Sequence, residues 1–503
     1  MWLADILFES AARHSGKVAL VCEDRRLTYG ALRAEIEKVA ANMQALGIGP
    51  SRRVALMLEN GTDFVIAYYA VLATGASVIS VSALLTQDEA GYILRDSAAD
   101  LLLSGGRVLE TARNAARGIG LNALQLADLD HDLLYAAPSP PDGRSEAVVM
   151  YTSGTTGKPK GAVLTHDNLV MNALVSAGHG MFNLTPDDVL LCCIPLFHAS
   201  GQSCLLNTGL LAGATVVIMR QFVAEAVLGI MASEQVTFFL GVPTMYVGLL
   251  GLVRPNSAQL PHLRMAVSGG APIPVAVLRE FETLFEVDIY EGYGLTETSP
   301  TSCFNQPDFE RRPGTIGKPI WGVDVEIAKI DVEDRIELMS PGEVGELIVR
   351  GHNVFAGYLN QPEATRACMV DGWFRTGDIA TKCGDGYVTI VDRKKDMIIR
   401  GGFNVYSREV EEVLNTHPAI ALAAVVGRPD DLFGEEIVAF VQLRADATVV
   451  SSADLLEWSK IKMAKYKYPR EFHFVESMPL GSGGKMLKRN LAEMALKKPE
   501  KSP

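Results

Sequence analysis

The strongest constraint on the fold is a repeated alternation of short apolar segments with helical patterns. Residues 18–21 form the first predicted strand, and residues 53–58 form the second. Between them a helix is expected to begin after Thr28, a suitable N-cap, and to end near Leu46, one residue before Gly47. A strand, a helix and a strand with apolar strand cores indicate a parallel sheet with helices on both faces.

The same alternation returns later in the chain. Further strands are predicted at residues 189–194, 215–219, 236–240 and 265–268. Catalytic groups of open α/β sheets gather at the ends of such strands, so we expect a site there. From residue 314 to 392 the pattern changes to short alternating strands separated by glycine turns, which predicts a small β-rich subdomain.

The chain also divides into parts. Its 503 residues exceed what one hydrophobic core usually fills, so two or more domains are expected. Five consecutive charged residues, 392–396, lie between apolar strands. Elements that predict a compact α+β unit come after them: a helix at 407–415, strands at 421–426 and 437–443, and a helix at 453–463.

One segment is similar to a membrane span, because residues 64–87 contain no charged side chain. Gly75 divides it into a helical half and a β-rich half, which favours a buried helix and strand of a soluble protein. Asp5 and Glu9 interrupt any signal-peptide pattern. Seven cysteines without a C-x-x-C pair fit a reducing cytoplasm, and the net charge of −13 argues against nucleic-acid binding.

Residues 151–161 have the composition of a phosphate-binding loop. Glycines let backbone N–H groups approach an anion, hydroxyls donate to its oxygens, and lysines neutralise its charge. A solvated surface turn is the alternative. The loop is not a Walker-type P-loop, because Pro159 follows Lys158 and only two residues separate Gly154 from Gly157. Since proline disfavours helix at the preceding residue, the loop is not expected to run directly into a helix.

This run resembles the signature of the adenylate-forming enzymes, which include acyl-CoA synthetases, peptide-synthetase adenylation domains and luciferases. Further segments resemble the other core motifs of that family and follow in the family's order. They are 267–272 (VSGGAP), 290–298 (YEGYGLTET), 373–378 (WFRTGD), 392–396 (DRKKD) and 479–485 (PLGSGGK). The resemblance covers essentially the whole chain and is nearest to the fatty-acyl-CoA and aryl-CoA synthetases.

The resemblance implies an α/β fold that is divided into a large and a small domain. A large N-terminal domain of parallel α/β subdomains and a small β-rich subdomain, residues 1–394, would be hinged at Lys395 to a small α+β domain, residues 395–503. The first would hold the ATP and acyl sites. The second would carry the catalytic Lys485 and a loop for the coenzyme A step, where Gly401 and Gly402 would admit pantetheine.

The resemblance also assigns roles in the large domain. Tyr293 would stack on adenine, Thr296 would contact the α-phosphate, and Glu297 would hold Mg²⁺. The Mg²⁺ of ATP is usually bound by one or two protein carboxylates together with the phosphates. His198 would gate the acyl and coenzyme A tunnel, which Gly269 and Gly292 would also line. Asp378 and Arg393 would contact the ribose. The full set of implied ATP and AMP contacts is Thr152, Ser153, Gly154, Thr155, Thr156, Gly157, Lys158, Gly270, Ala271, Pro272, Tyr293, Gly294, Thr296, Asp378 and Arg393.

These assignments predict an AMP-forming acid–thiol ligase that uses ATP, Mg²⁺ and coenzyme A. Loading of the acyl group onto a carrier protein, luciferase-like oxidation and a nonenzymatic nucleotide sensor are the alternatives. Gly269, Gly270 and Gly292 add little bulk to the expected pocket, which favours a fatty or bulky aryl acid. The basic segment 460–503 is either a solvated surface or a docking surface for coenzyme A. Peripheral membrane contact and a homodimer stay open.

Overall fold

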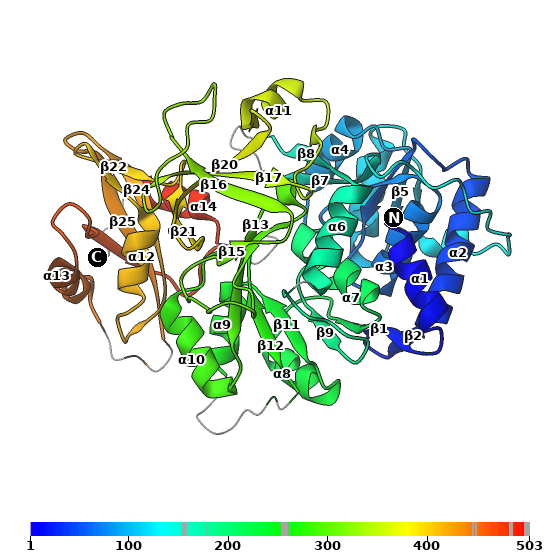
Figure 1. Cartoon of the computed structure of the whole chain (residues 1–503), viewed down its shortest axis with the longest axis horizontal. Coiled ribbons are helices and arrows are strands. Elements are labelled where there is room, and N and C mark those ends of the chain that lie inside the picture. The colour runs from blue at the N-terminus through cyan, green and yellow to red at the C-terminus, as the bar shows by residue number, and fades with distance from the viewer. Residues whose placement is uncertain are drawn as a thin grey trace.

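The computed structural model describes residues 2–152, 158–178, 180–252, 260, 262–444, 447, 450–481 and 486–496. In Figure 1 the C-terminal elements lie at the left, an antiparallel sheet lies above the centre, and two larger sheets occupy the centre and right. These two larger sheets contain the parallel strands that the sequence predicts. The α/β class expected from the alternation of strands and helices is confirmed.

The sheet at the right has seven strands in the order β18-β8-β7-β4-β3-β5-β6. The five strands from β7 to β6 in this order are parallel, whereas β8 and β18 are antiparallel to their neighbours. The strands are β3 (Arg53–Met57), β4 (Ser77–Ser80), β5 (Leu101–Ser104), β6 (Ala123–Leu124), β7 (Glu146–Thr152), β8 (Lys160–Thr165) and β18 (Gly357–Tyr358).

The second large sheet has nine strands in the order β15-β14-β13-β12-β11-β9-β10-β1-β2. Strands β13 to β1 in this order are parallel, and the flanking strands are antiparallel. The strands are β1 (Val18–Cys22), β2 (Arg25–Thr28), β9 (Val189–Cys192), β10 (Thr215–Ile218), β11 (Phe238–Gly241), β12 (Met265–Ser268), β13 (Ile289–Gly294), β14 (Thr301–Phe304) and β15 (Lys318–Pro319).

Helices cover these two sheets and fill the space between them. Thr28 caps α2 as predicted, because its side chain accepts a hydrogen bond from the Ala31 amide, and Gly47 beyond the helix has φ +81°. The helices are α1 (Asp5–Arg13), α2 (Tyr29–Ala45), α3 (Thr62–Ala73), α4 (Gln87–Asp96), α5 (Leu109–Arg117), α6 (His166–Ala177), α7 (Thr208–Leu211), α8 (Ala224–Ser233), α9 (Pro243–Leu250) and α10 (Val275–Phe285).

The uncharged segment 64–87 has the predicted division. Helix α3 touches strands of both large sheets, and all of its residues from Phe64 to Ala73 are buried. Gly75 then takes φ +82°, which a residue with a Cβ adopts at a cost, and β4 follows. The segment is apolar because it lies in the core, and no helix among the described residues is long and apolar enough to cross a bilayer.

The predicted β-rich region forms an antiparallel five-stranded sheet. It consists of β16 (Val323–Ala328), β17 (Gly345–Gly351), β19 (Met369–Val370), β20 (Trp373–Lys382) and β21 (Val388–Arg393), with α11 (Pro362–Cys368) alongside. Its apolar side chains, such as Val325 and Val349, join the same core as those of the large sheets. The region is therefore packed onto the large sheets.

The elements after residue 396 have cores of their own. A five-stranded sheet packs on one face against α12 and α13 and on the other face against α14. Its elements are β22 (Ile398–Arg400), β23 (Phe403–Val405), β24 (Ile420–Asp430), β25 (Gly434–Leu443), β26 (Glu471–Phe474), α12 (Ser407–Leu414), α13 (Ser452–Lys462) and α14 (Lys488–Leu496). This is the small α+β unit that the sequence predicts.

Candidate active site

Three side chains from different strands meet at the end of β13. The Tyr293 hydroxyl donates to Asp378 Oδ2 at 2.5 Å, and Arg393 Nε donates to Asp378 Oδ1 at 2.8 Å. Asp378 in β20 lies opposite Arg393 in β21 in the sheet register. Burial, followed by the charge of Asp378, raises the pKa of Tyr293 well above its ordinary value, so the phenol stays a neutral donor. The structure thus brings together three residues that the sequence motifs place 85 and 15 residues apart.

A second carboxylate, Glu297, lies in the short 3₁₀ helix Thr296–Thr298 and is 9% exposed. Its Oε1 accepts hydrogen bonds from the Tyr358 hydroxyl at 2.8 Å and from Thr152 Oγ1 at 3.3 Å. Strands β18 and β7 supply these two donors. Tyr358 was not predicted as a contact, because a two-residue Gly-Tyr strand has no distinguishing pattern in the sequence.

Glu297 has the chemistry expected of a ligand for the Mg²⁺ of ATP. Among the described residues, no lysine or arginine forms an ion pair with it, and its neighbours are neutral hydroxyl donors. The described part of the chain contains no group of three or more metal-binding side chains. A single carboxylate flanked by hydroxyl groups fits Mg²⁺, because this ion is usually held by one or two carboxylates together with substrate phosphates.

The expected phosphate loop connects β7 to β8. These strands pair antiparallel, with Thr152 opposite Lys160, so a strand and not a helix follows the loop, as predicted from Pro159. Ser153, Gly154, Thr155, Thr156 and Gly157 lie outside the described residues. At the ends of the loop, Lys158 Nζ lies over the ring of Tyr92 and Lys160 Nζ lies over the ring of Tyr358. Lys160 therefore lies against the tyrosine whose hydroxyl binds Glu297.

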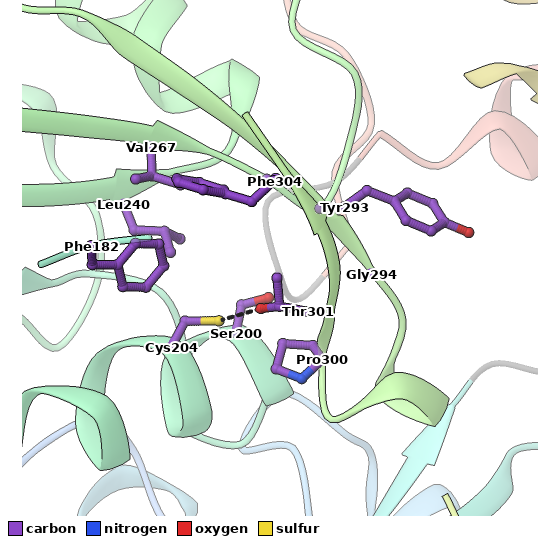
Figure 2. A pocket seen from close by; sticks show the side chains of 13 residues that line it. Phe182, Ser200, Cys204, Leu240, Val267, Tyr293, Gly294, Pro300, Thr301 and Phe304 are labelled. Atoms are coloured by element: carbon purple, nitrogen blue, oxygen red, sulfur yellow. Dashed lines mark hydrogen bonds between the residues drawn. The ribbon is translucent and has the colours of Figure 1, made fainter. Parts of the chain in front are cut away.

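Next to Tyr293 a narrow pocket enters the nine-stranded sheet at its strand ends (Figure 2). Side chains of Phe182, Leu240, Val267 and Phe304 form its apolar part, and Phe182 and Phe304 meet edge to face at 5.3 Å between ring centroids. Gly269, Gly270, Gly292, Tyr293 and Gly294 also line it. About 40 Å³ of its interior is open to a water molecule. None of the described residues that line it is charged.

The other side of the pocket carries small polar groups. Ser200 and Cys204 project from a π-helix, Ser200–Asn207, and Cys204 Sγ lies 3.5 Å from Thr301 Oγ1. Gly294 is required at the pocket's edge, because a Cβ there would lie 1.6 Å from the Pro300 carbonyl oxygen. The glycines belong to the sequence motifs and were predicted. Phe182, Ser200, Cys204 and Phe304 were not, because they are far from the motifs or carry no pattern of their own.

The remaining predicted residues lie around this centre. Gly270, Ala271 and Pro272 follow β12, and Gly270 has φ +80° in the turn after the strand. His198 follows β9 and lies against Phe197, with 4.7 Å between ring centroids. His198 is not among the residues that line the narrow pocket.

The C-terminal motifs lie in the elements after β21, which are at the left of Figure 1. Lys395 is exposed in the turn between β21 and β22. Gly401 and Gly402, with φ +57° and +82°, form the turn of the β22–β23 hairpin. Lys485 lies outside the described residues. The two ends of its loop meet, since Leu480 pairs with Met486 and the Leu487 amide donates to the Pro479 carbonyl at 2.9 Å.

Comparison with known proteins yields two family matches. Residues 7–359 match the AMP-binding enzyme model, and residues 409–485 match the model of the AMP-binding enzyme C-terminal domain. Long-chain-fatty-acid–CoA ligase of Bacillus subtilis is 34% identical over 98% of this chain and 94% of the relative. Feruloyl-CoA synthase of an Amycolatopsis species is 36% identical over 95% and 94%. The crystal structure of ATP-bound MatB from Rhodopseudomonas palustris is similar with a TM-score of 0.90, 29% identity and 98% coverage of both chains.

Proposed function

This chain belongs to the AMP-binding enzyme family, and from that premise we propose that it is an ATP-dependent acyl-CoA synthetase. A carboxylate oxygen of the acid attacks the α-phosphorus of ATP, pyrophosphate leaves, and acyl-AMP forms. The thiolate of coenzyme A then attacks the acyl carbon, and AMP leaves. The observation that carries the proposal is the position of Tyr293, which contacts the buried Asp378 on one side and lines the apolar pocket on the other.

The nucleotide side would be bound by the Tyr293, Asp378 and Arg393 group. Each oxygen of Asp378 already accepts one hydrogen bond and keeps lone pairs for a ribose hydroxyl. Arg393 holds the carboxylate of Asp378 in place by its hydrogen bond and opposite charge. The charge of Asp378 in turn raises the pKa of the Arg393 guanidinium, which therefore stays positive. The Tyr293 ring, fixed by its hydroxyl, would offer a flat face to adenine.

The phosphate side would be bound by the loop between β7 and β8, by Thr296 and by Glu297. When bound, Mg²⁺ supplies positive charge to the triphosphate and lowers the repulsion between two anionic reactants. Glu297 would orient that ion, and Thr152 and Tyr358 hold the carboxylate by their hydroxyls. Lys485 would add a second positive charge where the acid and the α-phosphate meet.

The second half-reaction would need the C-terminal part to turn. Lys485 must leave the α-phosphate before a thiol can reach the acyl carbon, and Lys395 lies in an exposed turn with room to change its backbone angles. In this proposal Gly401 and Gly402 then face the site, with residues 1–394 and 395–503 moving as two domains. His198 would border the thiol's path.

The acyl group belongs in the pocket beside Tyr293. The relatives named above act on acids as different as a long-chain fatty acid and ferulate, so their names leave the size open. An uncharged lining of Phe182, Leu240, Val267 and Phe304 disfavours a second carboxylate, because burying an unpaired charge is costly. The apolar lining favours a fatty or aryl acid, which the two phenylalanines would contact at its far end.

A panel of carboxylic acids tests both the proposed reaction and the proposed acyl pocket. We expect fatty or aryl acids to support ATP–pyrophosphate exchange and coenzyme A-dependent AMP release. Phe304→Leu should move the preference toward longer acids, whereas Phe281→Leu, equally buried but outside the pocket, should not. Exchange without any response to coenzyme A would favour a carrier-protein loader, and no exchange with any acid would contradict the proposal.

A further inference from the structure

Helix α12 contacts β21 across the expected hinge through its first two residues. The Ser407 amide donates to Asp392 Oδ2 at 2.5 Å, and Ser407 Oγ donates to Asp392 Oδ1 at 3.0 Å. Arg408 Nη1 donates to the Ile390 carbonyl at 2.6 Å. Ser407 and Asp392 are 0% and 5% exposed, so water does not compete freely for these bonds.

The same serine is held from the other side by the helix that follows the Lys485 loop. Lys488 Nζ, at the start of α14, donates to Ser407 Oγ at 2.6 Å and forms an ion pair with Glu411 Oε1 at 2.7 Å. The Ser407 hydroxyl therefore accepts from Lys488 and donates to Asp392. Glu411 is fixed in turn by the amide of Val425 in β24 at 2.8 Å.

These bonds continue into the nucleotide site. The Arg393 amide donates to Asp392 Oδ1 at 2.8 Å, and the Arg393 side chain binds Asp378, which binds Tyr293. A continuous path of hydrogen bonds thus joins the base of the Lys485 loop to the residues that would bind ribose. No other described lysine or arginine of α14 enters this path, since Arg489 pairs with Glu493 on the surface.

We propose that Lys488, Ser407 and Asp392 form a latch that holds the C-terminal part in the orientation for acyl-AMP formation. Ser407 is a positioning residue, because it touches neither substrate and acts through Asp392 and Lys488. If the chain turns at Lys395, Asp392 stays with β21, whereas Ser407, Glu411 and Lys488 move together. Rotation therefore breaks the Ser407–Asp392 bonds and leaves the Lys488–Glu411 pair intact.

Two observations indicate that the structure, in which the Ser407–Asp392 bonds are formed, has the orientation for acyl-AMP formation. The structure matches an ATP-bound relative over 98% of both chains with a TM-score of 0.90, which requires a similar placement of the two parts. The hairpin that would serve the second step lies at the surface, where Phe403 beside Gly402 is 57% exposed and stacks on the ring of Tyr466. A bond from Arg444 to Glu280 also crosses between the parts, but both side chains are partly exposed, so it contributes little.

The test compares the two half-reactions in Ser407→Ala, and it rests on the proposed function. Losing a hydroxyl donor to a charged acceptor should slow acyl-AMP formation about tenfold. Thioester formation from supplied acyl-AMP should stay at or above the wild-type rate, because the turned state is no longer opposed. Ser407→Thr should restore acyl-AMP formation, and Arg489→Met, one position after Lys488 on α14, should change neither rate.

A second variant covers the case in which Ser407→Ala unfolds. Lys488→Met combined with Glu411→Gln removes the donor to Ser407 together with the charge of its ion-pair partner, and it should slow the first half-reaction selectively. An unchanged ratio of the two rates, or an equal loss in both, overturns the latch. Absence of both half-reactions in the wild-type protein would instead contradict the proposed function.

Discussion

Tyr358→Phe removes one hydroxyl and tests whether Glu297 is the metal ligand. Tyr358 donates to Glu297 Oε1 at 2.8 Å, whereas the other donor, Thr152, is more distant at 3.3 Å. Burial, followed by the charge of Glu297, raises the pKa of Tyr358, so the phenol remains a donor throughout the working pH range. The substitution therefore removes the shorter of two bonds that orient the carboxylate.

The expected size follows from these contacts. A hydrogen bond to a charged group contributes about 1.5–3 kcal/mol, which corresponds to a factor of roughly 10–100 in affinity. Since Thr152 still holds the same oxygen, we expect the lower end, a tenfold rise in the Mg²⁺ concentration for half-maximal acyl-AMP formation. Calorimetry should show weaker binding of MgATP and unchanged binding of AMP, which carries no β- or γ-phosphate.

The control is Tyr151→Phe. Tyr151 precedes Thr152 on β7, but its hydroxyl donates to Asp96 at 2.6 Å and not to Glu297. This variant should keep the wild-type Mg²⁺ dependence. If Tyr358→Phe also keeps it, or if AMP binding weakens as much as MgATP binding, Glu297 has a structural role and the assignment is wrong.

Three further variants test other parts of the account. Lys485→Ala should reduce acyl-AMP formation roughly 10²- to 10³-fold and spare thioester formation from supplied acyl-AMP; equal losses would remove Lys485 from its role. Lys395→Pro should keep acyl-AMP formation and lose thioester formation, because proline fixes φ, while Lys395→Ala keeps both; a wild-type thioester rate in the proline variant would place the pivot elsewhere. Glu291→Gln should stabilise the fold at pH 8 by up to ~3 kcal/mol and have little effect at pH 4. Burial raises the pKa of Glu291 to about 7, so the free energy of unfolding falls as the pH rises from about 4.5 through 7, and a flat difference in melting temperature between pH 4 and 8 would refute this.

The sequence predicted the fold well where local patterns decide structure. The helix from Tyr29 to Ala45 follows from its Thr28 cap and Gly47, and the uncharged segment 64–87 divides at Gly75 as expected. The ends of several strands moved; β11, for example, covers Phe238–Gly241 instead of 236–240. Its register is set by pairing with β9 and β12, which the local sequence does not contain.

The site was predictable only in part, for a physical reason. Tyr293, Asp378 and Arg393 lie in motifs, so the resemblance located them before the structure showed their contacts. Phe182 and Phe304 narrow the pocket that the glycines alone would leave open, but each is one apolar residue among many in a strand-rich chain. The bonds of Ser407 and Lys488 join residues 81 positions apart, and only the folded structure brings them together.

The most direct test of the central claim follows the oxygen atoms of the acid. An acid from the panel, labelled with ¹⁸O in both carboxylate oxygens, is incubated with the enzyme, ATP and coenzyme A. The masses of the products are then measured by mass spectrometry. Attack of the carboxylate on the α-phosphorus leaves one carboxylate oxygen in the phosphate of AMP when the thiol displaces it. We predict AMP with one ¹⁸O atom, unlabelled pyrophosphate and one acyl-CoA for each AMP. ADP with labelled inorganic phosphate, or AMP without label, would contradict an acyl-AMP intermediate.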